Sequence, residues 1–174
     1  MKRTLLLPAL LLLFAGFAVG AVHLGWNVYE FKKADVEVKL PGEEYEEEKE
    51  KRENGKTYTV TTTAEGIVFK ASVFEMKRRV VKDLEEDEFR AKLYETVINN
   101  FEADPSITVE EVRDVEADGI AGKEADVKYE NGTYGYVRVL YKDRRSVTLV
   151  MMRNGEYPNN FYADVFFESV RFLD

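Results

Sequence analysis

The sequence contains no cysteine and only one histidine, His23. Without cysteine the chain has no disulfide, no thiolate nucleophile and no cysteine zinc site, so its stability must come from packing. His23 stands at the expected processing site of an export signal, so histidine-based triads and histidine metal sites in the folded domain are excluded by count. No G-x-S-x-G motif surrounds any of the serines, Ser72, Ser106, Ser146 and Ser169.

Long apolar runs are also missing, except for one at the N-terminus. An uncharged stretch over residues 4–22 follows Lys2 and Arg3. This order is typical of an export signal, and the length is also close to the roughly 20 residues that cross a bilayer. We therefore expect residues 1–21 to be a cleaved signal peptide or an N-terminal membrane anchor, and the protein to be periplasmic, secreted or membrane-anchored. No cysteine follows the run, which excludes a bacterial lipoprotein anchor.

Basic residues are outnumbered, since 25 lysines and arginines stand against 33 acidic residues and the net charge is −8. Without Lys2 and Arg3 the counts are 23 and 33, and the net charge is −10. Such a surface repels nucleic acid and anionic lipid, so we expect no nucleic-acid partner. Solubility outside the cell explains the excess of acid most simply.

Alternating apolar residues predict a series of strands. Val36, Val38 and Leu40 lie on one side of a strand over 35–40, and the strand over 146–153 is apolar on both sides. Asn54-Gly55 is a candidate type I′ hairpin turn, which needs positive φ at both central residues. The other predicted strands are 43–54, a charged edge strand, and 56–64, 67–76, 107–117, 123–130, 134–141 and 169–173.

The apolar period changes from two to about 3.6 after Asp83, which predicts the longest helix. Asp83 and Glu86 have the spacing of a capping box, and Asp104-Pro105 ends the helix near Ala103. A second helix is predicted from Pro158, with an apolar face made of Phe161, Tyr162, Val165 and Phe166.

These elements predict an α+β fold. We expect a twisted antiparallel sheet of about seven or eight strands, with the long helix on one face and the C-terminal helix on the other. The innermost strands are apolar on both sides, and such strands need cover on both faces. No internal repeat and no long linker divides residues 22–174, so we expect a single domain with its core between 35 and 173.

Several motifs recur in one order along residues 35–173, and together they resemble the PsbP-like fold. This fold is shared by the extrinsic PsbP subunits of photosystem II, the Ran-binding Mog protein and many exported bacterial proteins. Val170 departs from the pattern, because the family usually has phenylalanine there. The motifs are V-K-L-P-G at Val38–Gly42, the helix after Asp83, D-G-I-A-G-K-E at Asp118–Glu124, R-V-L-Y at Arg138–Tyr141, and F-F-E-S-V-R-F at Phe166–Phe172.

The resemblance implies a non-catalytic domain, without a cofactor, that docks on a larger protein partner. The fold does not name that partner. Two alternatives stay open. The stretch Glu43–Glu53 could collect Ca²⁺ or a similar cation through its carboxylates, or the chain could be a hydrolase with an unfamiliar carboxylate site, which would need one acid in an apolar pocket. No residue is assigned to a catalytic, metal or cofactor site.

Two short basic groups stand out in this acidic chain, Lys77-Arg78-Arg79 and Arg144-Arg145. Each lies beside an expected strand end, where loops often meet partners. Charge balance at loop ends explains them more simply. Asn131-Gly132-Thr133 fits a glycosylation sequon, but the hairpin turn predicted there requires Asn-Gly in any case.

Overall fold

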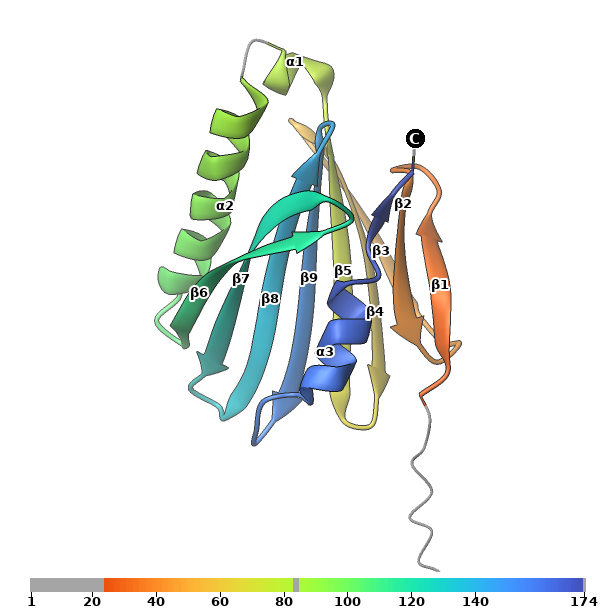
Figure 1. Ribbon diagram of the computed structural model, residues 1–174, viewed down its shortest axis with the longest axis vertical. Coiled ribbons are helices and arrows are strands. Elements are labelled where there is room, and N and C mark those ends of the chain that lie inside the picture. Colours follow the sequence, from red (N-terminus) through yellow and green to blue (C-terminus); the bar gives the residue numbers. More distant parts are fainter. Residues whose placement is uncertain (1–23, 83–84, 174) are drawn as a thin grey trace, which may run out of the picture.

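The computed structural model describes residues 24–82 and 85–173, and in this part of the chain the strands form two antiparallel sheets (Figure 1). The large sheet has seven strands in the order β3 (Glu46–Arg52), β4 (Gly55–Ala64), β5 (Ile67–Met76), β9 (Arg145–Asn154), β8 (Thr133–Lys142), β7 (Ile120–Tyr129) and β6 (Ile107–Ala117). The small sheet has the order β1 (Trp26–Phe31), β2 (Val36–Pro41) and β10 (Arg171–Phe172). The helices are α1 (Arg78–Val81), α2 (Glu86–Glu102) and α3 (Asn160–Phe167).

The large sheet packs on both of its faces. Along β8, Tyr136 and Leu140 belong to the core cluster that contains α3, whereas Val137 and Val139 belong to the cluster that contains α2. Successive side chains of a strand point to opposite faces, so α2 and α3 lie on opposite sides of the sheet. The predicted α+β class is confirmed, and the antiparallel sheet predicted to have about seven or eight strands has seven.

The α2 helix lies over β6, β7 and β8. Tyr94 and Ile98 are its buried residues, and they belong to the apolar stripe predicted after Asp83. Farther along this face, β4 carries a row of threonines that is half-exposed at most positions and suits contact with water. The row consists of Thr57, Thr59, Thr61 and Thr63.

The opposite face is covered jointly by α3 and the small sheet (Figure 1). Phe69 of β5 is fully buried there and makes edge contacts with Phe166 of α3 and with Trp26 of β1, at ring-centroid distances of 5.5 and 5.6 Å. One side chain therefore joins the two sheets and the helix.

The small sheet is the main departure from the predicted architecture. Residues 36–41 were expected in the large sheet, but they pair with β1 and β10 instead. The alternation itself is confirmed, because Val36, Val38 and Leu40 are all buried. Alternation predicts which side chains point inward, but it does not predict which strand lies alongside.

The turns also differ from prediction at one point. Glu53 and Asn54 form the β3–β4 turn, whereas Gly55 pairs with Arg52 inside the ladder and neither Asn54 nor Gly55 has positive φ. Gly55 is needed for a different reason, since a methyl group there would lie 2.3 Å from the carbonyl oxygen of Glu75. Positive φ occurs instead at Glu65-Gly66, between β4 and β5, and at Asp118-Gly119, between β6 and β7.

The helix boundaries match the prediction closely, but their capping does not. Asp83 of the proposed capping box lies outside the described residues, and the N-cap of α2 is Glu85, without a side-chain cap. The α3 helix begins after Asn159, whose side chain accepts a hydrogen bond from the Phe161 amide. Phe161 was predicted on the packed face, but 58% of it is exposed.

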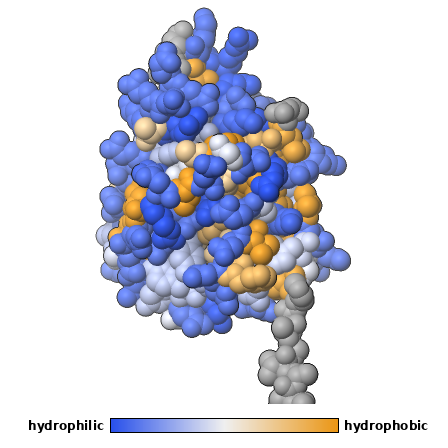
Figure 2. Space-filling model, in the orientation of Figure 1, coloured by the Kyte–Doolittle hydropathy of each residue, from blue (hydrophilic) through white to orange (hydrophobic). Residues whose placement is uncertain are grey.

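No helix within residues 24–82 and 85–173 is long and apolar enough to cross a membrane. The segment expected to be a signal or anchor, residues 1–21, lies outside the described residues. Figure 2 shows a mostly hydrophilic surface on the viewed face, with only small separate hydrophobic patches.

Candidate functional site

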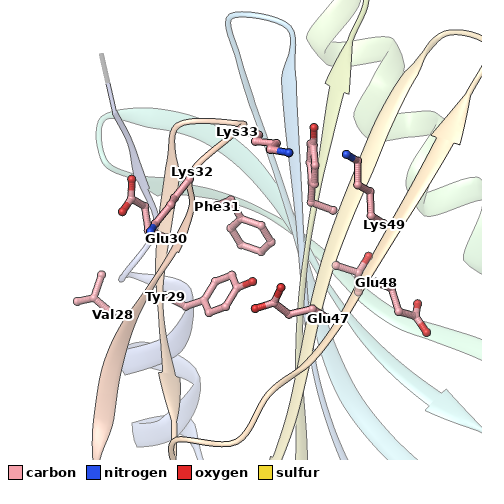
Figure 3. Close-up of a pocket in the computed structure, with 11 residues that line it drawn as sticks. Val28, Tyr29, Glu30, Phe31, Lys32, Lys33, Glu47, Glu48 and Lys49 are labelled. Carbon is pink, nitrogen blue, oxygen red and sulfur yellow. The ribbon is translucent and has the colours of Figure 1, made fainter.

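A groove of about 700 Å³ lies between the free edges of β1 and β3 (Figure 3). Among residues 24–82 and 85–173, β1 pairs with β2 alone and β3 with β4 alone, so each strand has one edge that no described strand pairs with. The lining residues are Val28, Tyr29, Glu30, Phe31, Lys32, Lys33, Glu47, Glu48, Lys49, Tyr58 and Thr59. We refer to this site as the edge groove.

Aromatic rings form the inner part of the edge groove. The Tyr29 ring contacts Phe31 and Tyr45 at centroid distances of 5.0 and 5.5 Å, in edge-to-face geometry. Phe31 is buried in the core cluster that joins the two sheets. This contact network holds the tyrosine ring in place without a ligand.

The Tyr29 side chain points across the edge groove toward Glu47 (Figure 3). Burial, a hydrogen bond to Glu47 and the negative charge of Glu47 raise the pKa of the Tyr29 phenol to about 12. The phenol is therefore protonated at neutral pH and points at the Glu47 carboxylate. This interaction lies between β1 and β3.

Two lysines of the edge groove have no acidic partner. Figure 3 shows Lys33, from the turn after β1, and Lys49, from β3, reaching toward each other from opposite walls. Neither forms an ion pair with a described residue, and Lys49 Nζ lies 5.5 Å from the centre of the Tyr58 ring. The groove lining also includes a third lysine that forms no ion pair with a described residue, Lys32.

The acidic residues of the lining point away from these lysines or are occupied. Glu48 is in register with Thr59, on the face of the large sheet opposite to Lys49, and Glu30 is in register with Glu37, on the outer face of the small sheet. Glu47 faces Tyr29. Glu47 keeps its negative charge, because its partner Tyr29 is neutral. The inner part of the edge groove therefore combines one carboxylate with Lys33 and Lys49 and is net positive.

A second pocket of about 510 Å³ lies between α3 and the strands β6, β7 and β8, and it contains a charged network. Arg138 Nε donates to Glu124 Oε2 at 2.7 Å, and both side chains are more than 90% buried. Arg113 bridges Glu124 and Asp126, with a 2.7 Å bond from Nη1 to Asp126 Oδ1. Burial raises the pKa of Asp126, while Arg113 opposes the rise.

This second pocket is the place where a carboxylate hydrolase site would have to lie. Both carboxylates accept hydrogen bonds from Arg113, and Glu124 also accepts one from Arg138, so each is held in an ion pair. Such a network is typical of a structural ion-pair cluster. The hydrolase alternative stays a prediction that these contacts do not favour.

The carboxylates of the acidic stretch Glu43–Glu53 do not converge on a common point. All residues of β3 are exposed, and Glu46, Glu48 and Glu50 point to one face of the sheet while Glu47 points to the other. Among residues 24–82 and 85–173, no group of three or more acidic or histidine side chains could hold a metal ion. The ion-binding alternative remains a prediction without a preformed site.

The basic groups singled out in the sequence lie side by side and hold strand ends together. Lys77 Nζ donates to the Glu53 carbonyl at 2.7 Å, and Arg144 Nη1 donates to the Met76 carbonyl at 3.2 Å. Arg145 Nη1 donates to the carbonyl of Leu173, at 3.0 Å, and to that of Asp35, at 3.1 Å. These contacts give the residues a structural role.

The serines likewise form local hydrogen bonds. The Ser72 hydroxyl lies 3.0 Å from that of Thr59, and Ser169 Oγ accepts from the Lys39 amide at 2.8 Å. His23, the one histidine, lies outside the described residues, and the structure brings no acid–histidine pair to any serine within them.

Sequence reasoning missed the edge groove because it made no prediction for residues 24–34. The alternation in W-N-V-Y-E-F, with Tyr29 and Phe31 on one side, was an available signal for β1. Nothing in the sequence indicated that Lys33 and Lys49 would meet, because they come from different sheets.

A solution structure of cyanobacterial PsbP from Synechocystis sp. PCC 6803 is similar to this chain. The TM-score is 0.53 over 91% of this chain and 98% of that one, at 11% sequence identity. A crystal structure of a Pseudomonas aeruginosa protein of unknown function matches with a TM-score of 0.40, over 74% of this chain and 83% of that one, also at 11% identity.

No protein-family model matches the sequence, and no curated protein matches it. The similarity to cyanobacterial PsbP covers most of this chain. At 11% identity it concerns the fold alone. The motifs over 35–173 and the structural similarity agree, and the chain has a PsbP-like fold.

Proposed function

We propose that this protein is a non-catalytic docking domain that works outside the cytoplasm and binds a protein partner through the edge groove. The observation that carries the proposal is the pair of unpaired lysines, Lys33 and Lys49, set over aromatic rings between two free strand edges. Proteins bind other chains through polar groups that lie beside apolar side chains. They also bind through unpaired strand edges, which form main-chain hydrogen bonds with the partner.

The N-terminal sequence supports a role outside the cytoplasm. The order of Lys2, Arg3 and the apolar stretch 4–22 is that of a signal or anchor, and the absence of cysteine is compatible with an oxidising compartment because no thiol needs protection. Cell fractionation with intact-mass measurement tests this. A full-length protein in the cytoplasm would contradict the proposal.

A non-catalytic role is supported by the state of the candidate acids. Glu124 and Asp126 are paired with Arg113, and Glu47 faces the Tyr29 phenol. Such pairing is typical of structural ion-pair clusters. It supports a structural use of these carboxylates.

Site-specific crosslinking tests the docking role. A photo-crosslinking amino acid is placed at Val28, which is exposed on β1, and in a matched control at Lys92, which is exposed on α2. After irradiation in intact cells, we expect one discrete adduct from position 28 and none from position 92. Equal labelling at both positions, or no adduct under several growth conditions, would refute docking through the edge groove.

A further inference from the structure

The edge groove has a shape and a charge that suit one class of occupant. Taking the docking role as given, we propose that the partner supplies an extended acidic segment, which adds as a strand to the free edge of β1 with its carboxylates against Lys33 and Lys49. This assignment rests on the proposed function and names the chemistry of the partner.

The β1 edge is the less protected of the two edges that border the groove. Every residue of β3 is charged, which is a common protection against strand addition. β1 carries one charged residue, Glu30, and exposes 59% of Val28. Its six residues span about 20 Å, so about six residues of a partner can pair with it.

Side chains of an added strand would alternate between two environments. Those on the outer side would lie beside Val28, whereas those on the inner side would face Tyr29, Phe31 and the two lysines. Main-chain hydrogen bonds provide affinity in such complexes, and the pockets for alternate side chains provide specificity. Carboxylates on the inner side would pair with Lys33 and Lys49.

A basic segment does not fit this site. A partner lysine would face two cations, Lys33 and Lys49, against the single inward carboxylate, Glu47, which also interacts with the Tyr29 phenol. The net charge of −8 also means that distant charges repel an acidic partner, so local pairing with the lysines must outweigh this repulsion.

Peptide binding tests the assignment on the exported protein, in the form that intact-mass measurement identifies. Three dye-labelled peptides of eight residues are compared by fluorescence anisotropy. The first alternates glutamate with threonine, the second has lysine in place of glutamate, and the third is the glutamate peptide with N-methyl groups on alternate amides. We expect the first to bind, and the other two to bind at least about tenfold more weakly.

Single charge reversals identify the site. Lys33→Glu and Lys49→Glu should each weaken the glutamate peptide about five- to tenfold, because a favourable pair becomes a repulsive one. The control Lys92→Glu changes the net charge equally on α2 and should leave binding within about twofold, since long-range charge is screened. Circular dichroism confirms that the variants fold.

The results that would contradict the acidic-strand assignment can be told apart from those that would contradict the docking role. Equal binding of the lysine peptide, unchanged binding of the N-methylated peptide, or reversals at Lys33 and Lys49 that behave like Lys92→Glu would each overturn the assignment. A dimer in sedimentation that the glutamate peptide dissociates would replace the acidic segment with a second copy. A specific adduct from position 28 with no peptide binding would leave the docking role standing and remove only the acidic strand.

Discussion

Glu124 and Arg138 form an ion pair that is almost fully buried, and both residues belong to motifs that support the PsbP resemblance. Arg138 also reaches Glu168 at the end of α3, and its guanidinium lies 5.0 Å from the Phe167 ring. The network thus ties α3 to β7 and β8. Removing one member of the network would leave another charge buried without its partner, which is strongly destabilising.

We predict that Glu124→Ala lowers the free energy of unfolding by about 3 kcal/mol, because it leaves Arg138 and Arg113 without their shared carboxylate. Urea denaturation measures the change. The control Glu116→Ala removes an exposed glutamate from β6 and should cost less than about 0.5 kcal/mol. A loss below about 1 kcal/mol for Glu124→Ala would show that the network is not structural.

Tyr94 gives the second prediction at this scale. Its hydroxyl donates to the Ala121 carbonyl at 2.7 Å, and burial raises the phenol pKa from 10.0 to about 12. Between these two pH values the unfolded chain binds fewer protons than the folded one, so stability falls as pH rises. Below pH 10 the phenol is protonated in both states, and this contribution is constant.

Tyr94→Phe should therefore lose about 1 kcal/mol at pH 7, from the missing hydrogen bond, and should show a shallower decline of stability between pH 10 and 12. Urea titrations at pH 7, 10 and 11 measure both effects. Tyr29, whose pKa is also raised to about 12, still contributes to the decline in this variant. An unchanged slope would mean that Tyr94 ionises normally in the folded protein.

At the scale of elements, close strand packing decides where glycine is required. Gly55 sits in β4 with negative φ, and its hydrogen faces the Glu75 carbonyl and the Phe74 ring. An added methyl group would meet both. The sequence pattern Asn54-Gly55 suggested a turn glycine, whereas the residue is needed for close approach of strands β4 and β5.

We expect Gly55→Ala to destabilise the protein by about 2 kcal/mol, because the backbone must move to accept the methyl group. Gly25→Ala is the matched control, since nothing lies within 4 Å of a methyl group at that position. Its effect should stay within about 0.5 kcal/mol. Comparable losses for the two variants in thermal or urea unfolding would show that steric crowding at Gly55 is not the cause.

At the scale of the whole molecule, the two sheets share one core. Trp26, the one tryptophan, lies in the small sheet and contacts Phe69 in the large sheet. Arg145 of β9 also bonds to carbonyls beside β2 and β10. Contacts of this kind couple the small sheet to the large one.

Unfolding should accordingly be one cooperative transition. Tryptophan fluorescence reports on the small sheet through Trp26, and far-ultraviolet circular dichroism is dominated by the large sheet. We expect the two urea curves to have the same midpoint and slope. A fluorescence transition at lower urea would mean that the small sheet separates first and that the chain has two cooperative units.

The sequence alone determined the α+β class, most strand and helix boundaries, the PsbP-like fold and the exclusion of histidine and cysteine chemistry. These properties follow from local periodicity, turn residues and counts, which need no knowledge of neighbours in space. The inward positions of Val36, Val38 and Leu40 belong to this group, because alternation determines them.

Only the tertiary structure decided which strands form the small sheet, where the ion pairs close and where the edge groove lies. Lys33 and Lys49 come from different sheets, and Glu124 meets Arg113 and Arg138 from neighbouring strands. Register and sheet-to-sheet packing place such groups together, and both depend on contacts between segments far apart in the chain. A groove between two strand edges therefore cannot be predicted from local sequence patterns.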